Sequence, residues 1–430
     1  MSDKSGIHSN LFSRNRKKLM NLLPPYAVAC LTSNDLMPRN GDQYFPYRQN
    51  SNLYYLTGIE QENTMLILCP SHPDQQMREI LFILRPDETT EIWEGRKLRS
   101  EEACSISGIE NVRFTNEFEA TLKDLLVQFP NIFLDQNEYP KFFPQIMTSE
   151  HRFALRMREM FPMNTLNRLS PLLWKLRLNK EPEEIDRILK ASQITGNAFQ
   201  RVLKYVKPGL SEHEVEAEIT SEFAKNRCNH AFQPIVAAGI NTCYLHYHSH
   251  EQKTEDGDLL LLDFGAEYEN YASDCSRTIP VNGKFTPRQL QVYEAVLRLQ
   301  RHALSLLVPG NNINQVNNEL NHLAEKEMIN LGLFNENDLA HQNPQQPLRF
   351  KYFMHGVSHF VGLDVHDVGS REEVFTPGMV LTFEPGIYIP EESIGLRLEN
   401  TFVIGYPSYN LMENIPIDPD EIEALMHQST

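Results

Sequence analysis

One aspartate interrupts a strongly apolar run and constrains the fold more than any other residue. The run Leu259-Leu-Leu-Leu-Asp-Phe264 has the length of a strand and is followed by Gly265. Such a run predicts a strand covered on both faces, where an unpaired carboxylate would cost several kcal/mol. We therefore expect a partner that neutralises Asp263.

A second aspartate, Asp274, follows a plausible turn at Tyr268-Glu269-Asn270. If the chain reverses there through a short, even-numbered loop, Asp263 and Asp274 lie on one sheet face, opposite each other or one diagonal step apart. Two carboxylates at so short a distance repel each other, so either one of them is protonated or a cation lies between them. Taken alone, the segment fits an exposed hairpin with two solvated aspartates as well as it fits a buried hairpin with a neutralised pair.

The length and composition predict a two-domain globular protein. A chain of 430 residues exceeds the usual single domain, and we expect an α/β domain over residues 1–170 and an α+β domain over residues 171–430, with a linker near residues 165–182. The hydrophobic fraction of 41% and charged fraction of 23% are those of a globular chain. A net charge of −17 argues against nucleic acid or an anionic membrane as partner and is compatible with a cation site.

Several features predict a cytoplasmic protein. No run approaches the roughly 18 apolar residues of a membrane span, and residues 1–8 lack the apolar core of a secretory signal. The six cysteines have no CxxC spacing and are expected to be reduced thiols. Cys275, beside Asp274, is expected to pack on the opposite face of its strand.

The two halves differ in their predicted elements. In the first half, apolar runs predict buried strands at residues 26–31, 64–69, 79–84 and 131–134, with helices over 11–23, 100–104 and 116–128. In the second half, helices are expected over 182–206, 286–307 and 313–331. Another begins at a capping box formed by Ser211 and Glu214 and runs to about Lys225.

A second pair of carboxylates repeats the pattern of the first. Glu384 interrupts the apolar segment 379–389, Glu399 interrupts 394–404, and a reversal near 391–393 would place both on one face. The segment 355–366 supplies three histidines. Each residue has an ordinary alternative: a strand glutamate is usually solvated or paired with an arginine, here Arg397, and a histidine near glycines is usually a loop residue. The joint pattern is much less probable by chance.

Four carboxylates with an imidazole and no thiolate predict a metal site. This donor set favours Mn²⁺, with Co²⁺, Fe²⁺ or Zn²⁺ as rivals. Four negative charges balance two divalent cations, and two ions about 3.5 to 4 Å apart can activate a water while polarising a substrate carbonyl. The predicted chemistry is hydrolysis.

In this order and context the residues resemble the pita-bread metallopeptidases, which include methionine aminopeptidase, prolidase and aminopeptidase P. The resemblance rests on the contexts LLDFG, SDCSRT, HGVSHFVGLDVHD, TFEPG and RLEN, and the segment YRQNSNLYYLTG at 47–58 is similar to the N-terminal domain of aminopeptidase P. It covers nearly the whole chain. It implies a pita-bread catalytic domain, an exopeptidase for peptides with proline at position 2, and a homodimer or homotetramer.

Carried over residue by residue, the resemblance implies that Asp263 and Asp274 hold one metal ion while His359 and Glu384 hold the other. Asp274 and Glu399 would bridge the two ions. Glu384 would also act as general base towards the attacking water.

The resemblance also implies substrate-side residues. His246, His355 and His366 would hydrogen-bond the scissile carbonyl, the developing oxyanion or the proline. Tyr388 and Arg397 would belong to the pocket and the groups behind it.

The chain departs from the family pattern after His246-Tyr247, where relatives often carry an asparagine and this sequence has His248-Ser-His250. We expect both of these histidines to be surface loop residues. Three rival functions remain at this point. They are a prolidase limited to Xaa-Pro dipeptides, a metal-free peptide-binding module, and a methionine aminopeptidase, which has no reason to carry so long an N-terminal domain.

Overall fold

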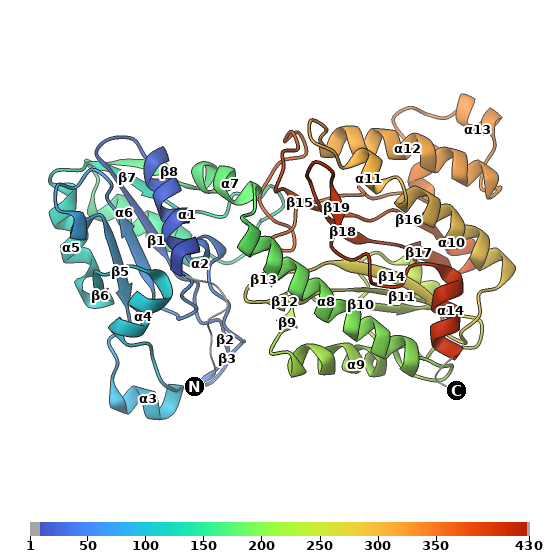
Figure 1. Ribbon diagram of the computed structural model, residues 1–430, viewed down its shortest axis with the longest axis horizontal. Helices are drawn as coiled ribbons and strands as arrows, with labels where there is room; N and C mark the ends of the chain where they lie inside the picture. The colour runs from blue at the N-terminus through green and yellow to red at the C-terminus, as the bar shows by residue number, and fades with distance from the viewer. Residues whose placement is uncertain (1–8, 428–430) are drawn as a thin grey trace. The chain divides into compact units, whose positions relative to one another are not determined.

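The computed structural model describes residues 9–427, so the N-terminal segment considered for a secretory signal lies outside it. The chain divides into two compact units, one ending at Arg177 and the other beginning at Leu178 (Figure 1). Among residues 9–427, no helix is long and apolar enough to cross a membrane.

The first unit is built on a six-stranded mixed sheet in the order β6-β5-β4-β1-β7-β8. Its strands are β1 (Ala27–Thr32), β4 (Met65–Leu68), β5 (Glu79–Ile83), β6 (Val112–Phe114), β7 (Asn131–Leu134) and β8 (Thr165–Arg168), and β2 (Pro38–Asn40) pairs with β3 (Gln43–Tyr44) in a separate hairpin. The helices are α1 (Ser9–Leu22), α2 (Ser51–Thr57), α3 (Glu88–Glu94), α4 (Ser100–Ser107), α5 (Phe118–Leu126), α6 (Ser149–Met160) and α7 (Ser170–Leu178). The predicted strands and helices of this half are confirmed.

Helices cover both faces of this sheet. Residues of α5 and α6 form one core with alternate residues of β1, β4, β5 and β7, while α1, α2 and α4 pack together over the other face (Figure 1). Because both faces are covered, the strands are apolar at successive positions rather than at every second one. The α/β prediction for this unit is confirmed.

A buried polar cluster ties α7 to the sheet. Asp135 follows β7, and Asn52 Nδ2 donates to both of its carboxylate oxygens at 2.9 Å. Ser170 Oγ donates to Asp135 at 3.3 Å, and Arg177 Nη1 donates to Asn52 Oδ1 at 2.7 Å. Burial raises the pKa of Asp135 to about 6. The linker predicted near 165–182 is therefore wrong over its first part, because β8 and α7 are ordered elements attached to the first unit.

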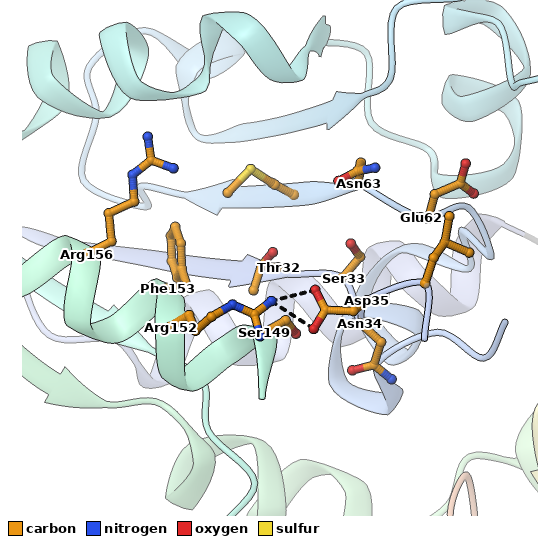
Figure 2. A pocket seen from close by; sticks show the side chains of 12 residues that line it. Thr32, Ser33, Asn34, Asp35, Glu62, Asn63, Ser149, Arg152, Phe153 and Arg156 are labelled. Atoms are coloured by element: carbon orange, nitrogen blue, oxygen red, sulfur yellow. Dashed lines mark hydrogen bonds and ion pairs between the residues drawn. The ribbon is translucent and has the colours of Figure 1, made fainter. Parts of the chain in front are cut away.

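A hollow of about 340 Å³ opens in the first unit between the end of β1 and α6 (Figure 2). Arg152 Nη2 donates to both carboxylate oxygens of Asp35, at 2.6 and 2.8 Å. Arg156 pairs with Glu119. Glu62, the remaining charged residue of the lining, pairs with Lys97. Each charged group of this hollow thus has an ionic partner.

The second unit combines helices with antiparallel strands. Its helices are α8 (Pro182–Tyr205), α9 (Glu212–Lys225), α10 (Pro287–Gln300), α11 (Ala303–Leu306), α12 (Ile313–Asn330), α13 (Glu336–Ala340) and α14 (Pro419–His427). Its strands are β9 (Asn229–His230), β10 (Ile235–Ala238), β11 (Leu259–Phe264), β12 (Ala266–Tyr268), β13 (Tyr271–Ala272), β14 (Cys275–Pro280), β15 (Val380–Phe383), β16 (Gly386–Ile389), β17 (Ile394–Arg397), β18 (Asn400–Val403) and β19 (Tyr409–Asn410). The α+β prediction is confirmed.

A large apolar core joins the main helices to the strands of this unit (Figure 1). Cys275 belongs to that core, as predicted, and all six cysteines are free. The single helix predicted over 286–307 is wrong, because exposed Arg301 and His302 form a turn between α10 and α11.

The first carboxylate hairpin, β11 to β14, keeps one register from Leu259 to Pro280. Tyr268 pairs with Tyr271, and the two loop residues between them, Glu269 and Asn270, have φ of 49° and 65°, as a two-residue turn of this hand requires. Asp263 pairs with Ser276, two residues beyond Asp274. The aspartates therefore lie one diagonal step apart on the same face, which confirms the predicted hairpin.

The second carboxylate hairpin, β15 to β18, repeats this design. Ile389 pairs with Ile394 across the loop 390–393, and the same register continues into the pairing of β15 with β18. Glu384 and Glu399 occupy opposed positions where the ladder is interrupted, next to Pro385, which has no N–H to donate. The Glu399 N–H donates to the Ser276 carbonyl at 3.1 Å, which joins the two hairpins.

Candidate metal centre

Three side chains from distant parts of the second unit meet where the two hairpins join. Asp274 comes from the first carboxylate hairpin, Glu399 from the second, and His359 from the segment that precedes β15. One ligand atom from each lies within 4.8 Å of the others. Asp274 and Glu399 are buried, and His359 is partly buried.

The orientation of His359 is fixed by its neighbours. Its Nδ1 donates to the Phe360 carbonyl at 3.1 Å, and its backbone N–H donates to Thr382 Oγ1 at 3.0 Å. The other ring nitrogen, Nε2, then lies 3.3 Å from Asp274 Oδ2 and 3.6 Å from Glu384 Oε1. Fixing one ring nitrogen on a carbonyl in this way is how proteins present the other to a metal ion.

Asp263 has one satisfied oxygen and one that is not. Arg397 Nη2 donates to Asp263 Oδ2 at 2.7 Å, whereas Oδ1 is buried without a hydrogen-bond partner among the described residues. Arg397 therefore pairs with Asp263 rather than with either glutamate, the two partners considered from the sequence. It also donates to Ser276 Oγ and Tyr388 Oη.

The carboxylates of this cluster repel one another. Burial, together with the charge of Asp263, raises the pKa of Asp274 to about 6 and that of Glu384 to about 7. The pKa of Glu399 is raised well above its usual value by burial and by the charges of the other three. Burial alone would lower the pKa of His359, but the contact with Asp274 and the charge of Glu384 raise it to about 9.

The donor set fits divalent cations. Four carboxylates face one guanidinium and one imidazole, and the buried Asp263 Oδ1 accepts from no described donor. A cation among these oxygens would remove their repulsion and satisfy the free one. The residues able to hold it are Asp263, Asp274, His359, Glu384 and Glu399.

His355 and Tyr388 form a second layer beside this cluster. His355 Nδ1 donates to the Gly356 carbonyl at 2.8 Å, so Nε2 accepts from the Tyr388 hydroxyl at 2.8 Å, and the hydroxyl oxygen accepts from Arg397 Nη1 at 2.8 Å. His355 Nδ1 lies 3.9 Å from Glu384 Oε2. Burial and the charge of Arg397 lower the pKa of His355 to about 4, so its imidazole is neutral at pH 7.

The two remaining predicted histidines are exposed at the edge of the cluster. The His366 ring centroid lies 4.3 Å from that of His359, and His246 is close enough for its charge to act on His355. The structure thus gathers all ten of the site residues predicted from the sequence around one centre.

The segment after His246 differs from expectation. His248 is exposed, as predicted. His250 is not a surface residue, because it is only 5% exposed, lies 2.8 Å from Glu216 and accepts from the Val236 N–H. Its contacts come from residues on α9 and β10, and periodicity within the segment carries no signal of them.

Sequence reasoning missed Ser276. Its hydroxyl donates to Glu399 Oε2 at 2.8 Å and accepts from Arg397 Nε at 2.9 Å, so it bridges the two hairpins. Strand alternation alone places Ser276, two residues after Asp274, on the sheet face that carries the aspartates, so the sequence could have indicated it.

Comparison with known proteins assigns the family. The model of metallopeptidase family M24 matches residues 186–405, and the model of the aminopeptidase P N-terminal domain matches residues 12–133. The chain belongs to metallopeptidase family M24. The M24 match contains all ten residues of the centre described above.

Relatives of this M24 chain match it along nearly its whole length. The Xaa-Pro aminopeptidase of Escherichia coli is 35% identical, over 98% of each chain. A putative aminopeptidase P from Bacillus anthracis superposes with a TM-score of 0.91 at 33% identity, over 99% of each chain. Zinc-substituted E. coli aminopeptidase P in complex with product superposes with a TM-score of 0.88 at 34% identity, again over 99% of each chain. The pita-bread domain with an α/β domain before it, which the resemblance implied, is confirmed.

Proposed function

We propose that this M24 protein is a metal-dependent aminopeptidase that hydrolyses the bond between the first residue of a peptide and a proline at position 2. The observation that carries the proposal is the cluster of Asp263, Asp274, His359, Glu384 and Glu399, with its buried, unpartnered carboxylate oxygen. The relatives named above support the choice of Xaa-Pro peptides as substrates.

Two divalent ions, most simply Mn²⁺, are proposed as the cofactor. Oxygen-rich donors with one imidazole favour Mn²⁺ over a thiolate-bound zinc site, and four carboxylates balance two divalent charges. Asp263 and Asp274 would hold one ion and His359 and Glu384 the other, and Asp274 and Glu399 would be shared by both. When bound, such ions supply Lewis-acid activation of water and of the scissile carbonyl.

Glu384 is proposed as the general base. Burial raises the pKa of its carboxyl group to about 7 when no ion is bound. Bound cations would set its basicity in the loaded site, where it would accept a proton from the attacking water. Thr382 Oγ1 lies 3.5 Å from Glu384 Oε1, on the strand that precedes it. A proton accepted at Glu384 can pass to the leaving proline nitrogen, whose tertiary amide has no hydrogen of its own.

His246, His355 and His366 are proposed to contact the substrate around the scissile bond. His355 is neutral, and its two ring nitrogens bond the Gly356 carbonyl and the Tyr388 hydroxyl, so it can donate to a developing oxyanion only by exchanging one of these bonds. Tyr388 and Arg397 are proposed to belong to the substrate pocket, and their hydrogen bonds also orient His355 and Asp263.

A cytoplasmic homodimer or homotetramer is proposed. Six free cysteines suit a reducing compartment. Large exposed apolar side chains on the first unit, such as Trp93 and Phe143, would be covered in such an assembly.

A peptide panel tests the proposed activity. The protein is stripped of metal, supplied with Mn²⁺, Co²⁺ or Zn²⁺ one at a time, and assayed on Xaa-Pro dipeptides, Xaa-Pro-Xaa peptides and matched Xaa-Ala-Xaa peptides. We expect cleavage of Xaa-Pro-Xaa peptides, and the fastest turnover with Mn²⁺. Cleavage of dipeptides alone would make the protein a prolidase, and absence of both bound metal and cleavage would make it a peptide-binding module.

A further inference from the structure

Glu212 lies outside the metal centre, yet it is a fully buried carboxylate whose bonds go to a loop of that centre. It is the first residue of α9 and is 0% exposed. Its Oε1 accepts from the Ala238 N–H at 2.7 Å and from Asn241 Nδ2 at 3.2 Å. Its Oε2 accepts from the Tyr247 hydroxyl at 2.7 Å and from the Gln252 N–H at 3.0 Å. One carboxylate thus binds residues 238–252, here called the His246 loop, on both sides of His246.

The chemistry of Glu212 makes it a strong anchor. A carboxylate removed from water must receive several hydrogen bonds, and the Ala238 and Gln252 N–H groups would lose this acceptor if the carboxylate were lost. The N-terminal end of α9 adds a favourable dipole at the same place. The Glu212 N–H also donates to the Gln252 carbonyl at 3.0 Å, so the end of the loop is held through backbone as well.

The opposite side of the His246 loop is attached to the second carboxylate hairpin. The Gly395 N–H of β17 donates to Thr242 Oγ1 at 2.8 Å. A side chain at Gly395 would lie 2.1 Å from the Thr242 carbonyl oxygen, so the two backbones approach too closely for any residue but glycine. Leu245 and Tyr247 pack in the apolar cluster that contains Tyr388.

His246 is therefore exposed between two anchored neighbours. Leu245 precedes it and Tyr247 follows it, and both are held against the cluster beside the metal centre. The Tyr247 hydroxyl in addition reaches Glu212. An imidazole on so short a span between fixed residues has little freedom to move away from His355.

We propose that Glu212 is a positioning residue for His246, holding the His246 loop so that this imidazole stays beside the metal centre. The part of this proposal that concerns the role of His246 in the reaction rests on the proposed function. The part that concerns the position of the loop does not. Among the described residues, Glu212 makes no hydrogen bond to a candidate metal ligand.

The substitution Glu212→Gln tests this with little change in volume. Glutamine keeps one acceptor but turns an NH₂ group towards the Gln252 N–H, which no longer has a partner. Hydrogen exchange in the metal-free protein should then become faster across residues 238–252. This readout does not depend on activity. Unchanged exchange in that segment would overturn the proposal, whether or not the protein cleaves any peptide.

Kinetics on an Xaa-Pro-Xaa peptide provide the second readout. We expect Glu212→Gln to lower kcat/KM by about tenfold to a hundredfold, because small displacements of a positioned group have effects of that size. The loss should divide between kcat and KM as it does in His246→Ala. In a His246→Ala background, Glu212→Gln should cost no more than about a further twofold.

Glu214→Ala is the matched control. Glu214 lies on the same helix, but its carboxylate accepts from the Ser211 N–H at the start of α9 and not from the His246 loop. This variant weakens the same helix terminus, and we expect it to change neither exchange across 238–252 nor kcat/KM by more than about twofold. Independent, additive losses from Glu212→Gln and His246→Ala would overturn the positioning role. An inactive wild-type protein would refute the proposed function instead, and exchange would still decide the role of Glu212.

Discussion

The metal centre of the second unit and the Asp135 cluster of the first unit both place carboxylates in a buried site at a strand end, but they resolve the charge differently. Asp135 is a single carboxylate, and three hydrogen bonds from Asn52 and Ser170 satisfy it. In the metal centre, four carboxylates share one arginine and one histidine, and Asp263 Oδ1 accepts from no described donor. Burial of a carboxylate alone therefore does not indicate a functional site. A buried carboxylate with too few hydrogen-bond donors and positive charges around it does.

The strongest test of this comparison removes one carboxylate from each cluster. Glu384→Ala should reduce kcat/KM on an Xaa-Pro-Xaa peptide by about a thousandfold or more, because the proposed general base and a proposed metal ligand are lost together. Asp135→Asn should leave kcat/KM within about twofold, since its cluster holds only the first unit together. Steady-state assays at a temperature where both variants are folded measure the difference. Comparable activity in the Glu384→Ala variant and the wild type would contradict the assigned base.

Metal binding should stabilise the folded protein through the carboxylates of the candidate metal centre and not through the Asp135 cluster. At a free Mn²⁺ concentration of about 100 times Kd, the wild type should gain about 2.7 kcal/mol of stability over the metal-free protein. Glu399→Gln should lose most of that gain. It should also raise the thermal midpoint of the metal-free protein at neutral pH, because the wild-type carboxyl group, whose pKa is raised well above its usual value, has to bind a proton on folding. Thermal unfolding with and without Mn²⁺ measures both effects, and Asp135→Asn, which should keep the full gain, is the control.

The Asp135 cluster should respond to pH in a predictable direction. Burial raises the folded-state pKa of Asp135 from 3.8 to about 6, so the folded state binds this proton more tightly than the unfolded chain does. Its contribution to stability is full below about pH 4 and is lost as the pH rises through about 6. Relative to Asp135→Asn, the wild type should lose about 3 kcal/mol between pH 4 and pH 7.

Tryptophan fluorescence can follow this loss, because both tryptophans, Trp93 and Trp174, lie in the first unit. Denaturant titrations at several pH values give the free energy of unfolding. A difference between the wild type and Asp135→Asn that does not vary with pH would show that Asp135 is ionised as readily in the folded state as in the unfolded one.

The smallest effect is expected at the hollow of Figure 2, where the charges are both paired and exposed. Asp35→Asn breaks the pair with Arg152, whose side chain is 49% exposed. Because solvent screens such pairs, the free energy of unfolding should change by no more than about 1 kcal/mol. A loss several times larger would mean that this hollow depends on its charge as the metal centre does.

Local pattern predicts the two hairpins well because strand parity fixes which side chains share a face. Asp263, Asp274, Glu384 and Glu399 were all placed by that argument, and the turn at Glu269-Asn270 has the backbone conformation the loop length demands. The partner of Arg397 was not predictable, since Glu384 and Glu399 share its own hairpin, whereas Asp263 comes from the other hairpin and is reached only where the two hairpins meet. Glu212 and His250 were missed for a related reason, because their contacts join α9 to a loop far away in the sequence.

The two carboxylate hairpins share a further property, which concerns changes in chain length. In each, the ligands lie several residues from the turn, and the register runs unbroken between them. Residues added at the tip, within 390–393, lengthen a loop without moving Glu384 past Glu399. One residue added between Gly386 and Ile389 would instead shift one strand against the other and turn a ligand to the opposite face. The protein can thus accept a tag or a longer loop at that tip, while the strands between tip and ligands must keep their length.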